Sequence, residues 1–304
     1  MFTPMTNIIF SLINDWLALR LDAKAMDFVR ATQQEVNSGV TDARFTALIS
    51  LSSRHIPRQL LTPSASECAS AYKILAGWNP QSWNLLETVR VSLVLLHPDL
   101  RNDDFSERFS KWFTYADEGE LCAYYRAIPL LPNPQRFVWR AAEGCRTNMK
   151  SVFMAVTCDS PFPSQCFDDI AWEQLVVKAL FSETPLHRVY GLDGRLSTTL
   201  AHMVLDYMDE RSSAGRDIPL DAWLCLGVYS DVRVDNAIQT ALQSSSLKNR
   251  CAAILALGRA KRNDRLQQLL NDNTDSRLNT VIQQALEGRV DQYAFHTLIS
   301  EVEG

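Results

Sequence analysis

Prolines divide this chain into short segments whose apolar residues recur at helical spacing. A proline lacks the amide hydrogen that a helix interior needs and disfavours helix in the preceding residue, so each of these prolines marks an interruption. Strand signals are nearly absent, because the Asp193–Gly194 pair precedes a helical segment and joins no alternating runs. The sequence therefore predicts an all-α fold with helices at 6–20, 23–37, 41–53, 64–77, 80–96, 103–117, 119–128, 135–157, 167–182, 196–212 and 219–228.

The chain after Pro219 contains no further proline and has a helical pattern of its own. Its apolar stripes comprise Leu247, Cys251, Ile254 and Leu255, then Leu266, Leu269 and Leu270 after a turn at Gly258, and then Leu278, Val281, Ile282, Ala285 and Leu286 before Gly288. Paired amphipathic helices that bury each other's open faces are typical of HEAT repeats. The pattern predicts an irregular helical solenoid with HEAT-like repeats towards the C-terminus.

Charge and cysteine usage restrict the class of partner and the compartment. With 30 basic and 35 acidic residues the formal charge is −5, and no run of five like charges occurs, so we expect no nucleic-acid partner. The seven cysteines are odd in number and never spaced C-x-x-C, so we expect free thiols in a reducing compartment.

Two further observations concern membranes and export. The apolar stretch at 8–13 has no basic residue before it, unlike a secretory signal. No segment approaches the roughly 18 uncharged apolar residues of a membrane-spanning helix. We therefore expect a cytoplasmic protein without a membrane span.

An acidic cluster at the start of one predicted helix suggests a possible metal site. Asp103, Asp104 and Glu107 resemble the aspartate-rich motif that holds magnesium on a diphosphate, since oxygen ligands suit a hard cation. Acidic residues also occur at helix N-termini without any metal, because the helix dipole favours negative charge there. The alternative that this cluster indicates, an enzyme acting on a prenyl or sugar diphosphate with magnesium, needs a second acidic helix facing it.

A narrow polar line crosses the otherwise apolar segment 196–212. His202, Asp206 and Asp209 share one helix face at this spacing and could bind a transition metal with help from another element. A solvated helix face is the alternative. The chain contains no G-x-S-x-G, phosphate-binding glycine loop or H-E-x-x-H motif, so no familiar nucleophile or cofactor is indicated.

Basic and amide residues are concentrated in the middle of the chain, among segments too apolar to be wet on every side. Two hypotheses account for them: a partly hidden pocket for an anionic or polyhydroxylated molecule, or internal salt bridges between helices. The candidate ligand-binding residues are Arg146, Asn148, Lys178, Arg195, His202, Asp206, Arg211 and Arg216.

Four ordered blocks over about residues 119–223 resemble the EboA family: ELCAYYRAIPLLPNPQRF, EGCRTNMKSVFMAVTCDSPFPSQCFDDIAWEQLVVKALF, PLHRVYGLDGRL and DYMDERSSAGRDIPLDAW. The matching positions include Arg146, Thr147, Asn148, Trp172, Gln174, Lys178, Phe181, Arg195, Asp206, Tyr207, Arg211 and Arg216. The turn Ser160-Pro161-Phe162-Pro163 departs from the family's Asn-Pro-Tyr-Pro-like pattern. The polar contribution of that asparagine and tyrosine is therefore missing here.

The resemblance implies a bacterial protein of specialised (secondary) metabolism that takes part in metabolite traffic, with no catalytic residues and no cofactor. It implies partners among a small metabolite and cluster-encoded enzymes, including a membrane prenyltransferase similar to UbiA. We expect three regions: residues 1–118, the family-motif region 119–228, and HEAT-like repeats at 229–304. A purely architectural scaffold is the remaining alternative.

Overall fold

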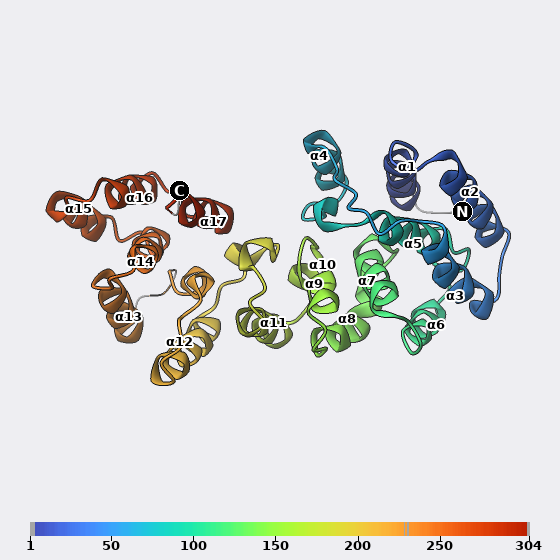
Figure 1. Ribbon diagram of the computed structural model, residues 1–304. Coiled ribbons are helices and arrows are strands. Elements are labelled where there is room, and N and C mark those ends of the chain that lie inside the picture. The colour runs from blue at the N-terminus through green and yellow to red at the C-terminus, as the bar shows by residue number, and fades with distance from the viewer. Residues whose placement is uncertain (1–3, 228, 230, 303–304) are drawn as a thin grey trace. The chain divides into compact units, whose positions relative to one another are not determined.

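The computed structural model of the chain describes residues 4–227, 229 and 231–302 (Figure 1). The protein is 70% helical. The described residues contain no strand, only an isolated antiparallel bridge between Leu60 and Asn84. The predicted all-α fold is confirmed.

By packing, the chain forms two compact units, residues 1–168 and residues 169–304. The first contains α1 (Pro4–Ala18), α2 (Ala23–Asn37), α3 (Asp42–Leu51), α4 (Ala65–Ile74), α5 (Leu85–Leu95), α6 (Phe105–Trp112), α7 (Glu118–Ala127), α8 (Val138–Cys145), α9 (Lys150–Thr157) and α10 (Phe162–Cys166). The second contains α11 (Asp169–Phe181), α12 (Thr198–Ser213), α13 (Val232–Leu242), α14 (Leu247–Arg259), α15 (Asn263–Asp272), α16 (Ser276–Leu286) and α17 (Gln292–Glu301). Short 3₁₀ turns join them: η1 (Ser52–Arg54), η2 (Pro80–Ser82), η3 (Ile128–Leu130), η4 (Pro134–Phe137), η5 (Leu186–Arg188), η6 (Leu192–Gly194) and η7 (Leu220–Cys225). The three-region division stays a prediction, because it follows motifs and not packing.

Helix α5 forms the centre of the first unit. Every residue from Leu85 to Leu95 is buried, and the helix packs against α1, α2 and α7. A cluster of edge-to-face aromatic rings, including Phe105, Phe109 and Trp112, fills the space beside α6. Trp83, Trp112 and Trp172 are all buried.

Capping explains several helix starts and one break. Ser64 and Glu67 form a capping box at the start of α4. The predicted single helix 135–157 is wrong, because α8 ends at Cys145 and α9 begins at Lys150. Between them the Thr147 hydroxyl accepts a hydrogen bond from the Met149 amide at 3.1 Å, a local bond that competes with the helix ladder.

A salt bridge between Arg20 and Glu67 joins the end of α1 to α4. The guanidinium donates to both carboxylate oxygens, at 2.9 and 2.6 Å, and both side chains are largely buried. The hydrogen bond from Arg20 lowers the pKa of Glu67 from 4.5 to about 2, with further help from the Ser64 amide and against the effect of burial. This carboxylate is therefore ionised in the folded protein at every pH above about 2.

Because of this salt bridge, we expect the first unit to lose stability in acid. Because the folded pKa lies below the unfolded value, the contribution of the pair is complete above pH 4.5 and disappears as the pH falls towards about 2. We expect the melting temperature of the first unit to fall across this window. The Glu67→Gln variant should melt lower at pH 7 and change less across the window, whereas parallel acid profiles of variant and parent would contradict the assignment.

Helix α14 forms the centre of the second unit's C-terminal part. It packs against α13, α15, α16 and α17, and all residues from Cys251 to Gly258 are buried. The helix continues one residue past the predicted turn at Gly258, to Arg259, and the turn follows at residues 260–261. A Cβ at Gly258 would lie 2.9 Å from the Cβ of Ala285, so the glycine permits the close approach of α16.

Two other expectations have clear outcomes. Of the segment predicted as a helix at 219–228, residues 220–225 form a 3₁₀ turn, η7, and residue 228 lies outside the described residues. All seven cysteines are free thiols, as predicted. Burial raises the pKa of the Cys122 and Cys251 thiols to about 11, so these two side chains act as small apolar residues.

Candidate functional site

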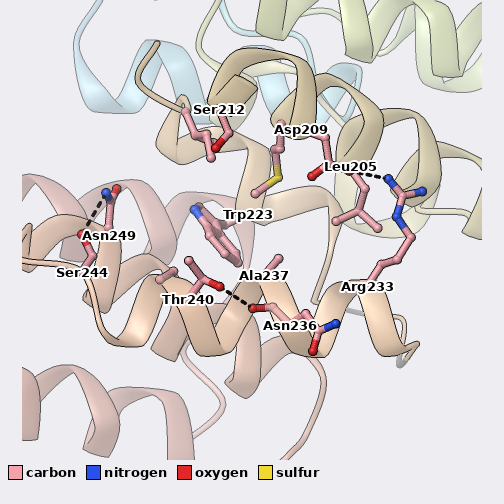
Figure 2. Close-up of a pocket in the computed structure, with 13 residues that line it drawn as sticks. Leu205, Asp209, Ser212, Trp223, Arg233, Asn236, Ala237, Thr240, Ser244 and Asn249 are labelled. Atoms are coloured by element: carbon pink, nitrogen blue, oxygen red, sulfur yellow. Dashed lines mark hydrogen bonds and ion pairs between the residues drawn. The ribbon is translucent and has the colours of Figure 1, made fainter. Parts of the chain in front are cut away.

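A groove of about 450 Å³ lies in the second unit, where α12, η7, α13 and the start of α14 meet (Figure 2). This volume is in the range of small-molecule sites. The lining residues are Leu205, Met208, Asp209, Ser212, Ile218, Trp223, Arg233, Asn236, Ala237, Thr240, Ala241, Ser244 and Asn249. An apolar surface with several polar groups at its margin is the usual composition of a ligand pocket.

The floor of the groove is formed by Trp223 of η7. Its side chain is 3% exposed, and neighbouring Leu205 and Met208 are equally buried. Figure 2 shows the indole nitrogen at the end of the ring that faces Asn249 and Ser212. No described residue accepts a hydrogen bond from this N–H group. The Nε1 atom is not one of the fully buried side-chain atoms that lack a partner, so it stays within reach of water or of a ligand oxygen in the groove.

Three hydroxyl and amide side chains form the polar wall. Asn249 lies near the start of α14, and its Nδ2 donates to the Ser244 hydroxyl at 3.4 Å. On α13, the Thr240 hydroxyl donates to the Asn236 carbonyl at 2.9 Å (Figure 2). These groups can both donate and accept hydrogen bonds, as recognition of hydroxyl groups requires.

Arg233 lies at the mouth of the groove and is the only cationic residue in its lining. Two carboxylates pair with its positive charge. The guanidinium Nη2 donates to Asp206 and to Asp209, each at 2.8 Å. Beside this triad, His202 lies 3.0 Å from Asp231, the residue that caps α13. The hydrogen bond from the Val234 amide and, to a lesser extent, the hydrogen bond with His202 hold the pKa of Asp231 below its usual value. The capping carboxylate therefore stays ionised.

The predicted polar line is therefore a surface that joins two helices. The side chains of His202, Asp206 and Asp209 are exposed on α12 and meet partners on or just before α13. No group of three or more potential metal ligands occurs among the described residues. The cluster at Asp103, Asp104 and Glu107 lies at the start of α6, where Glu107 pairs with Lys111 at 2.8 Å.

The remaining candidate residues lie on both units. In the first unit, Arg146 caps α8 and pairs with Glu143, and its side chain is 72% exposed. Asn148 is also exposed, in the loop before α9. The expectation that these groups are partly hidden is wrong for this pair, because the short loop between two helices projects their side chains into solvent.

In the second unit the basic candidates are separated along the chain. Lys178 is half-buried on α11. Arg195 pairs with Asp169 at 2.7 Å, and its guanidinium lies over the Trp172 ring. Arg211 donates to the Asp217 carbonyl at 2.5 Å, and Arg216 is exposed beyond the end of α12. None of these four lines the groove.

Sequence reasoning missed Trp223, Arg233, Asn236 and Asn249 as site residues. The first closes the last family block, and its position within the 3₁₀ turn η7 gives no separate signal. The others lie in the proline-free region, where helical spacing hides their role. The one usable signal was the pair Asp206 and Asp209, whose unpartnered charges on one helix face called for a cation on a neighbouring helix.

The fold and the groove define an all-helical protein with a pocket of small-molecule size. The sequence profile of one family, described as metabolite traffic protein EboA, matches residues 9–227, which is more than half of the chain. The chain belongs to the EboA family. The comparisons with curated proteins and with solved structures gave no match.

Among the helices that the structure describes, none has both the length and the apolar character needed to cross a bilayer.

Proposed function

We propose that this protein binds a small metabolite in the groove of its second unit and carries it without converting it. The observation that supports this most strongly is Trp223, a buried aromatic floor whose N–H group has no acceptor among the described residues. The family's role in metabolite traffic agrees with a carrier.

The chemistry of the lining supports binding more than catalysis. Its one carboxylate, Asp209, is engaged with Arg233, and the lining residues include no histidine, cysteine or lysine. General acid–base and nucleophilic mechanisms need such a group with a pKa suited to proton transfer or attack. The groove instead offers hydroxyl, amide and indole groups, which orient a ligand.

The finer parts of the proposal concern packing and partners. The stacking of α13 with α14, and of α15 with α16, supports a HEAT-like arrangement in which the second unit presents an extended surface to partner proteins. Those partners would include the UbiA-like membrane prenyltransferase and other enzymes of the biosynthetic cluster. The protein would act in the cytoplasm, where free cysteines stay reduced.

Native mass spectrometry of the protein purified from its own host tests the proposal. We expect a metabolite to co-purify with the parent. The Ala237→Phe variant, which places a ring inside the groove from α13, should retain at least about tenfold less, because filling the pocket removes more than about 1.4 kcal/mol of binding.

Two controls interpret that result. Ala69→Phe makes the same change at an exposed position of α4 and should retain the metabolite fully. Arg146→Ala tests the residues that the sequence proposed for binding. Loss in Arg146→Ala with full retention in Ala237→Phe would move the site to the first unit, and absence of any metabolite from the parent would favour a purely architectural role.

A further inference from the structure

Resting on the proposed function, we propose that the groove takes an uncharged, ring-bearing molecule with hydroxyl groups and discriminates against phosphorylated molecules. The ring would pack on Trp223, and one ligand oxygen would accept a hydrogen bond from its Nε1. The discrimination comes from Arg233, whose positive charge is already held by two carboxylates.

The charges at the mouth of the groove disfavour a phosphorylated ligand. Arg233 is the only cation in the lining, and Asp206 and Asp209 each accept a hydrogen bond from its Nη2 at 2.8 Å. Together these three side chains have one net negative charge. A phosphate would have to displace both carboxylates from Arg233 and then remain close to them, whereas an uncharged ligand meets no such repulsion. Arg233 and the two aspartates are exposed to solvent, so dissolved salt weakens the repulsion of a phosphate without reversing it.

The hydrogen-bond donors and acceptors inside the groove favour a ligand with hydroxyl groups. The Trp223 N–H group is a donor only, so its ligand partner must be an oxygen or another acceptor. Asn249, Ser244 and Ser212 lie on the side to which the indole nitrogen points, and each can donate or accept. Hydroxyl groups satisfy such a mixed set. The side chains of Leu205, Met208 and Ile218 cover the remaining surface and favour an apolar ring face.

Saturation-transfer difference NMR on the full chain at pH 7 tests the class of ligand with two probes of similar size. Phenyl β-D-glucoside is an uncharged ring with hydroxyl groups, and phenyl phosphate carries close to two negative charges. We expect the glucoside to bind at least about fivefold more tightly than the phosphate, since interactions with a charged group of this kind change affinity by this order. Trp223→Phe keeps an aromatic face, although a smaller one, and removes the donor, and should weaken glucoside binding by about two- to tenfold.

A gain of binding isolates the role of the charges. Replacing both acids, as Asp206→Asn with Asp209→Asn, releases Arg233 and should raise the affinity for phenyl phosphate, relative to that for the glucoside, by at least about fivefold. Asp264→Asn with Asp272→Asn makes the same change of net charge at exposed positions of α15, away from the groove, and should leave both affinities unchanged. An equal gain in this control would mean that overall charge, and not the release of Arg233, determines binding.

The outcomes separate the ligand class from the proposed function. Phosphate binding as tight as glucoside binding in the parent would overturn the class, and so would a failure of both probes while a host metabolite still co-purifies. In either case the carrier function would stand. Failure of both probes together with no co-purified metabolite would overturn both proposals.

Discussion

Replacing Arg90 with methionine is expected to lower the free energy of unfolding of the first unit by about 3–5 kcal/mol. The side chain is 1% exposed in the middle of α5, where its Nε donates to the Ile49 carbonyl at 3.1 Å. Its Nη2 lies 3.4 Å from the buried carboxylate of Glu120, and its Nη1 lies 3.7 Å from Asp117. Removing the guanidinium leaves the Glu120 charge buried with too little compensation.

Urea denaturation would measure this change in the free energy of unfolding. Hydrogen-exchange mass spectrometry of peptides that cover α5 would show that the change lies in the first unit. Arg44→Met is the matched control, because it breaks an ion pair of 2.6 Å with Glu35 at the exposed surface, where such pairs contribute little. Adding Glu120→Gln to Arg90→Met should restore part of the loss. Equal stability of Arg90→Met and the parent would show that water reaches Glu120.

Replacing Arg259 with methionine is expected to destabilise the second unit by about 3 kcal/mol. The side chain is 5% exposed at the end of α14, and its Nη2 donates to Asp193 at 2.6 Å and to the Leu224 carbonyl at 3.0 Å. Its Nη1 donates to the Val290 carbonyl at 2.6 Å. One guanidinium thus joins α14 to η6, to η7 and to the segment before α17, and methionine satisfies none of these acceptors.

The same substitution should also loosen the groove, since Leu224 directly follows Trp223. We expect faster hydrogen exchange in peptides covering η7 and lower retention of a bound metabolite. Arg262→Met is the control, because that side chain is 41% exposed and lies 3.4 Å from Asp235. Comparable losses in the two variants would mean that a positive charge near this end of α14 matters more than the buried hydrogen bonds.

Helix positions could largely be predicted from the sequence, whereas their interruptions could not. The spacing of apolar residues predicts α2 at its observed bounds, 23–37, because one face of the segment is consistently apolar. The break between α8 and α9 depends on a side-chain hydrogen bond at Thr147, which no periodicity reveals. The pattern predicts the turn after α14 to within two residues of Gly258, but it does not reveal that this glycine allows α14 and α16 to pack closely.

The candidate site was predictable only in part, for a similar reason. The helical repeat places His202, Asp206 and Asp209 on one face, and the structure confirms that shared face. Their partners are on or before α13, and only the packing of α12 against its neighbours determines that Arg233 meets the two aspartates. Basic residues such as Arg146 stood out by composition, which carries no information about the direction of a side chain.

Only part of the groove lies within the stretch that the family profile matches. Trp223 and the α12 residues fall within the stretch that the family profile matches, residues 9–227, whereas Arg233, Asn236 and Asn249 come after it. The aromatic base of the groove thus lies inside the matched stretch, and the side chains opposite it lie outside. If the groove holds a metabolite as proposed, substitutions in α13 and α14 alone would alter which ligand it accepts, without redesign of the helices around Trp223.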